Sequence, residues 1–444
     1  MSHASLNHSL FRFLAEHSTA ARLVVAYSGG LDSTVLLHLL TQLRNQSRES
    51  RPIQAIHINH GLSSNSGRWQ QHCEEVCSVL GVPLQVCRVS VSNQGGGLEA
   101  AARDQRYKAF EEMMQRGDAL LLAHHLDDQA ETLLLRLMRG AGPKGLAAMP
   151  EVRSLGNGVL LRPLLDVSRL QLHDWANTFG LSWVDDESNE SLDFDRNYLR
   201  HSVLPLLEQR WPGFAERWQQ SARLCGEADQ QIQEQAELDV ALAALRPERW
   251  GWSLDLAALQ SLSEFRRGNL IREVARRLQL PAPDSVHLQQ LEAQLVVPRP
   301  DAKAQVRWGD MSIRHFQGRL YWLPDTVALT RPPDTSWDLQ SPLRWPGAEL
   351  LAWQDAGEGL CLPSGSEVQV TLRQPGDRCR PAGRGHSQTL KKLLQEYRLE
   401  PWLRDRVPVL RLGEEIVAVG DLWVCHDYFG QSPNAVRLSW QRPL

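Results

Sequence analysis

The feature that most constrains the fold of this chain is an alternation of strand-like and helix-like segments between residues 22 and 185. Short apolar runs such as RLVVAYS, IQAIHINH and ALLLAHH take turns with amphipathic stretches such as STVLLHLLTQLR. This order is typical of βαβ units, in which helices cover both faces of a parallel sheet. We therefore predict an α/β fold with a doubly wound parallel sheet. Ligands bind such sheets beyond the carboxyl ends of the strands, so we expect a site in the loops after Tyr27, Asn59 and His125.

The rest of the sequence predicts two further domains after an α/β domain of residues 1–213. Between residues 214 and 325 the strand signals fade, and helical patterns predict a mainly helical domain. A stretch rich in proline, residues 324–346, suits a linker. Residues 345–444 contain strand-like segments on both sides of one helix, TLKKLLQEYR, which predicts a small α+β domain. A chain of 444 residues is long enough for three such units.

Composition argues against several other classes of protein. No apolar run reaches the roughly 18 to 20 residues that cross a bilayer, and the amino end lacks a basic leader, so we expect a cytoplasmic protein with no membrane partner. The seven cysteines are scattered and odd in number, which indicates free thiols rather than a disulfide framework. A net charge of -4 does not by itself indicate a nucleic-acid binder, so basic residues have to be considered locally.

The strongest chemical signal is the segment VVAYSGGLDSTVLLHLL, residues 24–40, where an apolar strand runs into a glycine pair and then a helix. Glycine lets the backbone approach a ligand closely, and the start of a helix offers unpaired N–H groups to an anion. We predict that a nucleotide phosphate binds to Ser28, Gly29, Gly30, Leu31, Asp32 and Ser33. Because Asp32 would repel a phosphate, we also predict a bridging Mg²⁺ ion at this carboxylate. The alternative is a plain turn in which Asp32 or Ser33 caps the helix.

This glycine loop has neither the G-x-x-x-x-G-K-[ST] pattern nor the G-x-G-x-x-G pattern. It matches the S-G-G-x-D-S loop of the ATP pyrophosphatase (PP-loop) family at every fixed position. The resemblance implies ATP as the cofactor. It also implies that ATP is split between its α and β phosphates, which leaves AMP on a substrate oxygen and releases pyrophosphate.

A second group of polar residues follows the strand ALLLAHH, at the same edge of the predicted sheet. Asp128 and Glu131 lie three residues apart on the first turn of a helix that we expect to bury Ala130, Leu133, Leu134, Leu137 and Met138. One alternative is a capping box with Asp128 as the N-cap. Another is a metal site formed by His124, His125, Asp127 and Asp128. Two carboxylates beside a polyphosphate loop favour instead a cationic ligand, either Mg²⁺ or an ammonium group.

Several motifs together resemble the tRNA(Ile)-lysidine synthetase family in order and spacing. They are AHHLDDQAETLLLRLMRGAGPKGL, GLEAAARDQRYKAF, RPLL, DRNYLRHSVLP and, near the carboxyl end, LKKLLQEYRLEPWLRDRVPVL with IVAVGDLWV. The resemblance covers nearly the whole chain, least clearly residues 215–365, and the segment Leu399-Glu400-Pro401 departs from the proline pair of the family.

The resemblance implies a ligase that forms a carbon–nitrogen bond. AMP is transferred to the C2 oxygen of the wobble cytidine in the CAU anticodon of tRNA(Ile), and the ε-amine of free L-lysine then displaces it to give lysidine. Carried over by motif, the catalytic residues are Asp32, His124, Asp128, Glu131 and Arg196. His124, Asp128 and Glu131 would hold the lysine and help to deprotonate its amine, which otherwise has a pKa of about 10.4. Family likeness also suggests a homodimer.

Basic residues near these motifs are candidates for RNA contacts. We predict that the RNA is contacted by Arg103, Arg106, Arg136, Arg139, Lys391 and Lys392. The alternative for each is a solvated surface charge. Two other functions compete with the ligase. A sister enzyme that inserts sulfur into tRNA shares the loop, but this chain has no Cys-x-x-Cys pair. The second competing function is that of a non-catalytic RNA-binding protein with an inactive remnant of the phosphate loop. The complete S-G-G-x-D-S motif argues against it.

Overall fold

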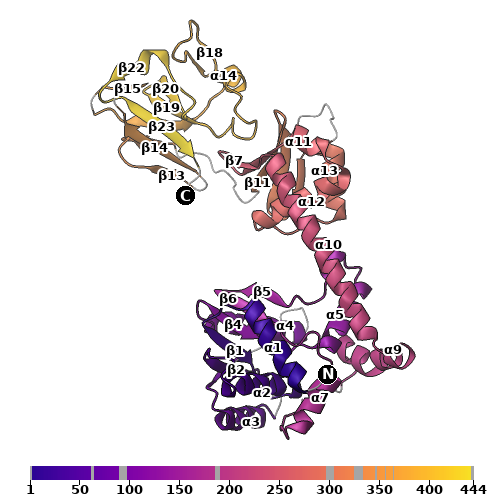
Figure 1. Ribbon diagram of the computed structural model, residues 1–444. Helices are drawn as coiled ribbons and strands as arrows, with labels where there is room; N and C mark the ends of the chain where they lie inside the picture. Colours follow the sequence, from indigo (N-terminus) through magenta and orange to yellow (C-terminus); the bar gives the residue numbers. More distant parts are fainter. Residues whose placement is uncertain are drawn as a thin grey trace. The chain divides into compact units, whose positions relative to one another are not determined.

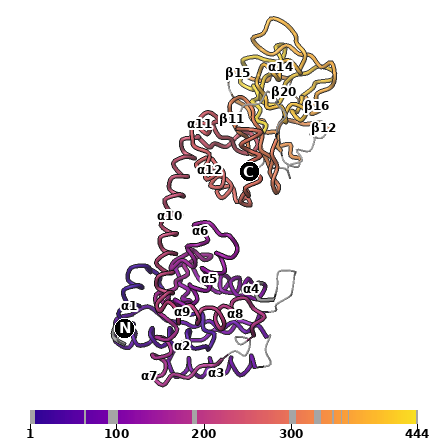
Figure 2. Tube along the Cα trace, turned by 90° about the vertical axis from the view of Figure 1, so that its right-hand side faces the viewer, coloured from indigo at the N-terminus to yellow at the C-terminus, as the bar shows by residue number. Residues whose placement is uncertain are grey.

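The computed structural model describes residues 3–61, 65–89, 98–185, 191–296, 305–324, 334–345, 348–355, 357–363 and 365–441. The chain divides into two compact units, Met1–Gln231 and Ile232–Leu444, which are drawn in Figures 1 and 2. The boundary between them falls within the helix α10 (Phe214–Leu242). Residues 325–333, which form much of the predicted linker, lie outside the described residues. The domain boundaries predicted at residues 213, 325 and 345 stay predictions.

A six-stranded sheet in the order β3-β2-β1-β4-β6-β5 organises the first unit (Figure 1). Its parallel strands are β1 (Arg22–Ala26), β2 (Ile53–Asn59), β3 (Leu84–Arg88), β4 (Asp118–Leu121) and β6 (Gly158–Leu161). The edge strand β5 (Val152–Leu155) pairs antiparallel with β6. The predicted α/β fold with a parallel sheet is therefore confirmed, with one antiparallel edge that the sequence pattern did not indicate.

Helices cover both faces of this sheet because its central strands are apolar on both sides. Leu23 and Val25 of β1 pack into one core, whereas Val24 packs into the other, as the alternation of side chains along a strand requires. The first core contains residues of α1 (His3–His17), α2 (Leu31–Asn45), α3 (Ser66–Leu80) and α7 (Arg169–Thr178). The second contains Phe110 of α4 (Leu98–Met113). The sheet is thus doubly wound.

The strand order brings the two predicted site loops together. After β1 the chain moves outward through β2 and β3 and then returns through α4 to β4, which pairs with β1 in the register Val25↔Leu121. The loops that leave the carboxyl ends of β1 and β4 are therefore neighbours at the point where the direction of winding reverses. Such a switch point is where open α/β sheets bind ligands.

A group of helices completes the first unit beside this switch point. They are α5 (Leu126–Met138), α6 (Pro143–Leu146), α8 (Asp195–Tyr198), the π-helical turn η2 (Leu199–Val203), α9 (Leu204–Arg210) and the start of α10. Ala130 of α5 packs with Leu204 and Phe214 in a small separate core. The expectation that α5 also buries Leu137 and Met138 is wrong, because their side chains are 56% and 80% exposed at its carboxyl end.

The region predicted to be mainly helical contains the expected helices and a sheet besides. The helical elements are α11 (Leu256–Ser261), α12 (Glu264–Arg277), α13 (Ser285–Leu291) and the turn η3 (Glu292–Val296). They pack on an antiparallel sheet of β7 (Arg246–Pro247), β8 (Trp252–Asp255), β11 (Arg319–Pro324), β10 (Met311–Phe316) and β9 (Gln305–Trp308). The strands are short, and Gly309 and Gly318 have positive φ angles in the turns between them, which suits tight hairpins.

The carboxyl-terminal region is rich in β-structure around the single predicted helix, α14 (Leu390–Glu396). One sheet contains β12 (Thr335–Trp337), β16 (Val368–Leu372), β19 (Pro408–Leu412), β20 (Glu415–Val419) and β21 (Trp423–Val424). A second contains β13 (Leu343–Trp345), β14 (Ala348–Gln354), β23 (Val436–Gln441), β15 (Gly357–Leu360) and β22 (Phe429–Ser432). The short pair β17 (Arg378–Cys379) and β18 (Gln388–Thr389) and the turn η4 (His426–Tyr428) complete it. In the described parts of the chain, no helix combines the length and the apolar character that a membrane span requires.

Candidate active site

The glycine loop opens the helix α2 without a side-chain cap. Gly30 is the N-cap residue, and no side chain of the described loop accepts a hydrogen bond from the first turn of this 15-residue helix. The alternative in which Asp32 or Ser33 caps the helix is therefore not what the structure contains. The hydroxyl of Ser33 instead donates to the carbonyl of Gly30 at 3.1 Å and lies 3.0 Å from the hydroxyl of Ser28. The exposed N–H groups at the helix start are available to an anion.

Gly29 is the position in this loop that only glycine suits. Its φ angle is +86°, and a Cβ atom at this residue would lie 2.8 Å from Sγ of Cys73 and 3.1 Å from Cγ2 of Val184. Its carbonyl oxygen also accepts a hydrogen bond of 3.0 Å from the backbone N–H of Val184. The backbone conformation and the close neighbours thus both demand the absence of a side chain.

His125 joins the glycine loop to the acidic helix, although the sequence analysis gave it no role beyond a possible metal ligand. Its Nε2 atom lies 3.7 Å from Oδ2 of Asp32 and 3.5 Å from Oδ2 of Asp128, and its Nδ1 atom lies 3.4 Å from Oδ2 of Asp127. The side chain is only 1% exposed. Burial lowers the pKa of His125, but the three carboxylates together raise this pKa above its ordinary value. The concentration of negative charge around His125 therefore favours its protonated form.

Asp32 retains one carboxylate oxygen for a ligand. Its Oδ1 atom is buried and has no hydrogen-bond partner among the described residues. Burial raises the pKa of Asp32, and the positive charge of His125 opposes this effect. Buried polar atoms in proteins are nearly always satisfied, so an unsatisfied carboxylate oxygen beside a phosphate loop suits a cation. The described residues contain no group of three or more His, Cys, Asp or Glu side chains arranged to hold a metal ion.

The two carboxylates of α5 are bound by two arginines from one helical segment. Nε of Arg196 donates to Oε2 of Glu131 at 2.6 Å, and its Nη2 donates to Oδ1 of Asp128 at 2.9 Å. Arg200 repeats this pattern, with Nε at 2.7 Å from Oε1 of Glu131 and Nη2 at 3.1 Å from Oδ1 of Asp128. The side chain of Glu131 is 0% exposed. Both of its oxygens are therefore occupied by guanidinium groups.

Arg200 lies in the site although the sequence motifs did not indicate a role for it. It follows Arg196 by four residues within DRNYLR, and the helical turns of α8 and η2 direct both side chains toward α5. The i,i+4 spacing in that motif was the available signal. Burial would raise the pKa of Asp128, but His125, Arg196 and Arg200 hold this pKa below its usual range. Asp128 is thus a stable anion within the cluster.

His124 is held by an arginine that the sequence analysis also left without a role. Nε of Arg162 donates to Nδ1 of His124 at 3.2 Å. Burial lowers the pKa of His124 to about 3, so the imidazole is neutral at pH 7. Because Nδ1 accepts a hydrogen bond, the remaining ring proton belongs on Nε2. His124 is therefore neutral and retains an N–H donor at Nε2.

The predicted RNA contacts lie in different surroundings. Arg103 and Arg106 flank Tyr107 on α4, while Arg139 is exposed just after α5. Nη1 of Arg136 instead donates to the carbonyls of Gly145 and Ala148, at 2.8 Å and 2.6 Å. This guanidinium group therefore holds the loop after α5.

In the carboxyl-terminal region, Lys391 and Lys392 are exposed on α14. Nζ of Lys392 lies 3.8 Å from Oε1 of Glu396. The positive charge of three nearby arginines is compensated, because each of them pairs with a carboxylate at least 12 residues away in the sequence. These pairs are Arg373 with Asp405, Arg380 with Asp427 and Arg384 with Glu396. Among the described residues of this segment, Lys391 and Arg378 form no ion pair with a carboxylate, and Arg378 donates to the carbonyl of Ser387.

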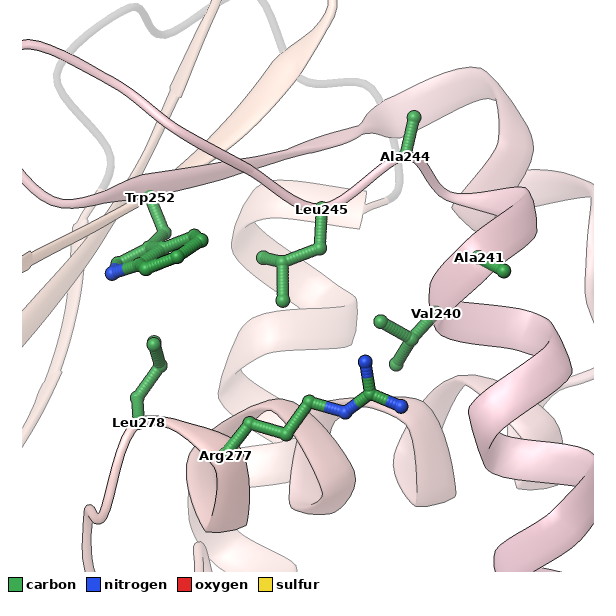
Figure 3. Close-up of a pocket in the computed structure, with 7 residues that line it drawn as sticks. All are labelled: Val240, Ala241, Ala244, Leu245, Trp252, Arg277 and Leu278. Carbon is green, nitrogen blue, oxygen red and sulfur yellow. The ribbon is translucent and has the colours of Figure 1, made fainter.

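A pocket of about 330 Å³ in the second unit is of a different kind (Figure 3). It is lined by Val240, Ala241, Ala244, Leu245, Trp252, Arg277 and Leu278. The guanidinium group of Arg277 extends toward Val240 in Figure 3, and its Nε atom lies 2.8 Å from Oε1 of Glu273. The lining offers no carboxylate, imidazole or thiol. The chemistry of the molecule is therefore expected at the switch point of the first unit.

Comparison with known proteins assigns a PP-loop domain to the first unit. Family models match a PP-loop domain at residues 3–207, a TilS substrate binding domain at residues 254–321 and a TilS substrate C-terminal domain at residues 368–440. A tRNA(Ile)-lysidine synthase of Serratia proteamaculans is 41% identical over 450 residues and covers 100% of both chains. One of Shigella flexneri is 38% identical over 427 residues, which are 96% of this chain and 98% of that one. The chain belongs to the tRNA(Ile)-lysidine synthase family.

Membership of the tRNA(Ile)-lysidine synthase family confirms the resemblance found in the sequence. It also favours the ligase over the sulfur-inserting enzyme and the non-catalytic RNA binder. Among solved structures, a U34-tRNA thiolase from Methanococcus maripaludis is similar with a TM-score of 0.42 and 17% identity, covering 50% of this chain and 79% of that one.

Proposed function

We propose that this chain joins the ε-amine of free L-lysine to C2 of the wobble cytidine in the CAU anticodon of tRNA(Ile). The products are lysidine, AMP and pyrophosphate, and the enzyme is a ligase that forms a carbon–nitrogen bond. The observation that carries the proposal is the position of His125, which contacts Asp32 of the glycine loop and Asp128 of the acidic helix. A nucleotide and an amine bound at these two elements would meet in one crevice.

The first step requires activation of a poor electrophile. The C2 carbonyl of cytosine has an oxygen that leaves badly, and transfer of AMP to this oxygen makes it a good leaving group. The uncapped start of α2, with the hydroxyls of Ser28 and Ser33, would bind the phosphates of ATP. Asp32 would hold a Mg²⁺ ion through its unsatisfied Oδ1 atom, and this ion would neutralise the phosphate charge.

The second step requires lysine to be held by its head group with its ε-amine free. The cluster of Asp128, Glu131, Arg196 and Arg200 contains both carboxylates and guanidinium groups in direct contact. A bound amino acid can take over these ion pairs. Its α-carboxylate can bond to the guanidinium groups, and its α-ammonium group can bond to the carboxylates. We therefore infer that this cluster binds the lysine head group. The ε-amine would then extend toward the adenylated base. Its attack on C2 forms the carbon–nitrogen bond and breaks the bond between C2 and the oxygen that carries AMP, and a carboxylate of the cluster would accept the proton that the amine loses.

His124 would contribute a hydrogen bond rather than accept a proton. Its Nδ1 atom accepts from Arg162, and burial keeps the ring neutral by lowering its pKa to about 3. An N–H group at Nε2 can stabilise negative charge that develops on an oxygen of the base or of the departing AMP. This role differs from the deprotonation of the amine that the family resemblance suggested for His124.

The RNA would be bound by exposed basic side chains of both units. In the first unit, Arg103 is exposed and Arg106 half-buried on α4, and Arg139 is exposed directly after α5. In the second unit, Lys391 and Lys392 are exposed on α14. Arg136 is a weaker candidate, since it is engaged with backbone carbonyls. The homodimer suggested by family likeness stays a prediction.

The proposal is tested by incubating the full chain with ATP, labelled lysine and a tRNA(Ile) transcript that carries the CAU anticodon. We expect label in the RNA, with one AMP and one pyrophosphate released for each lysine joined. A transcript with the wobble cytidine replaced by uridine is the matched control and should stay unlabelled. Release of AMP without label in the RNA, or RNA binding without AMP release, would refute the ligase function.

A further inference from the structure

Arg162 is a buried cation without a carboxylate partner among the described residues. Its residue is 3% exposed and follows β6 directly. Its guanidinium group donates to Nδ1 of His124 at 3.2 Å and to the carbonyl of Pro150 at 2.6 Å, and it also bonds to the hydroxyl of Tyr107. All of these partners are neutral acceptors. Buried charges in proteins are normally paired, so the counter-ion of Arg162 is expected to come from a bound ligand.

Further guanidinium groups gather around Tyr107. The Cζ atoms of Arg153, Arg103 and Arg106 lie 4.7, 5.1 and 6.0 Å from the centroid of the tyrosine ring. Burial raises the pKa of Tyr107, but the arginines together lower this pKa below its ordinary value. Like Arg162, Arg153 forms no ion pair with a carboxylate in the described part of the chain. The cluster is therefore strongly positive, and an anion would stabilise it.

The position of the cluster along the sheet indicates which anion it receives. Ser28 follows β1, His124 comes shortly after β4 and Arg162 follows β6, and these three strands are neighbours in that order. Adjacent strands are about 4.8 Å apart, so Arg162 lies roughly 10 Å along the edge from the glycine loop. His124 lies between them. His124 thus separates the cluster from the proposed site of the nucleotide phosphates, which favours an anion of the other substrate, the RNA.

We propose that Arg153, Arg162 and Tyr107 form a binding site for a backbone phosphate of the substrate RNA, close to the base that is modified. The proposal rests on the proposed function. A planar guanidinium group can donate two parallel hydrogen bonds to phosphate oxygens, and the hydroxyl of Tyr107 can donate a further one. Arg162 also holds Nδ1 of His124, so the same side chain that receives the phosphate orients the imidazole. This gives a physical role to the arginine of the motif RPLL.

The test is the salt dependence of RNA affinity in full-length variants. Affinity for the tRNA transcript is measured by fluorescence anisotropy over a series of KCl concentrations. Each phosphate that a protein neutralises contributes about 0.7 to 0.9 to the slope of log affinity against log salt. For Arg153→Gln combined with Arg162→Gln we expect this slope to fall by about one and Kd to rise about tenfold. The matched control is Arg12→Gln, on α1, whose side chain is 68% exposed and pairs with Glu16.

An unchanged slope in a folded double variant would overturn the proposal. If Arg162→Gln does not fold, Arg153→Gln and Tyr107→Phe decide, because Arg153 is exposed and the tyrosine change removes one hydroxyl. Inhibition by inorganic pyrophosphate and the KM for ATP are measured on the same variants. A change in these values with an unchanged RNA slope would assign the anion to pyrophosphate and refute the RNA site.

These outcomes remain distinct from failure of the proposed function. A wild-type enzyme that transfers no lysine to RNA refutes the function, whatever the variants do. A wild-type enzyme that is active, with variants that bind RNA as the wild type does at every salt concentration, refutes only the phosphate site.

Discussion

The Nε2 atom of His125 lies 3.7 Å from Oδ2 of Asp32, although the two residues belong to loops that follow different strands. The same nitrogen lies 3.5 Å from Oδ2 of Asp128. One buried imidazole thus compensates a carboxylate of the proposed nucleotide site and a carboxylate of the proposed lysine site. Any change at this residue should therefore affect both halves of the crevice.

We expect His125→Asn to destabilise the protein because it leaves buried carboxylates uncompensated. Removal of one partner from a buried ion pair costs about 3 to 5 kcal/mol, and we expect a loss of this order in the free energy of unfolding. The measurement is urea unfolding of the full chain. His8→Asn is the matched control, since His8 is exposed on α1. Equal urea midpoints for the two variants would show that the charge of His125 is not needed.

A second expectation concerns acid pH. Burial lowers the pKa of His124 to about 3, so at mildly acid pH the unfolded chain binds a proton at this residue that the folded chain does not. Folding stability then falls as the pH decreases below about 6.5, by up to about 1.4 kcal/mol for each pH unit. His124→Asn should remove this part of the pH dependence between pH 6.5 and 4.5. Unfolding free energies of wild type and variant that decline in parallel over this range would contradict the assignment.

We expect Arg200 to contribute to the binding of lysine and not to the binding of ATP. Replacement by lysine keeps the charge but loses the fork that bonds to Asp128 and Glu131. For Arg200→Lys we expect the KM for lysine to rise by about 10- to 100-fold, which corresponds to about 1.4 to 2.7 kcal/mol, with the KM for ATP unchanged. Steady-state kinetics with the tRNA transcript measure both values. Arg210→Lys, at an exposed position of α9, is the control and should behave as wild type.

A side chain at position 29 should disturb the glycine loop and lower activity. In Gly29→Ala the new Cβ atom would meet Sγ of Cys73 at 2.8 Å, and the φ angle of +86° is unfavourable for alanine. A left-handed backbone costs roughly 1 to 2 kcal/mol for a residue with a side chain, so the loop should shift. We expect pyrophosphate release to fall at least about tenfold for such a loss of binding energy. Gly67→Ala, where no atom lies within 4 Å of the added Cβ, should keep full activity.

The lysines of α14 test the RNA contact of the second unit. We expect Lys391→Ala with Lys392→Ala to weaken RNA binding and to lower the salt slope by up to about two, since each phosphate contributes about 0.9. Anisotropy titrations at several KCl concentrations give both quantities. Lysine-dependent release of AMP at saturating RNA should be unaffected. A variant that binds RNA with the same slope as wild type would leave these lysines as solvated surface charges.

The sequence by itself determined the elements whose pattern is local. The alternation of apolar strands and amphipathic helices predicted the parallel sheet, because a strand buried on both faces must be apolar throughout. The glycine pair after β1 predicted the phosphate loop, because glycine lets the backbone approach a ligand closely, and the structure adds that Gly29 has a φ angle of +86° beside Cys73. The rule that ligands bind beyond the carboxyl ends of such strands then predicted the loops of the site, whereas the strand order came from the structure.

Only the tertiary structure decided how the charges pair and which apolar residues are covered. Arg200 bonds to Glu131 across 69 positions of sequence, and its i,i+4 spacing from Arg196 indicates a shared helix face but not the partner on α5. Leu137 and Met138 continue the apolar stripe of α5 but extend beyond the helices that cover it. A local period reports which face of a helix is apolar, whereas burial and ion pairing depend on neighbours that folding brings from elsewhere in the chain.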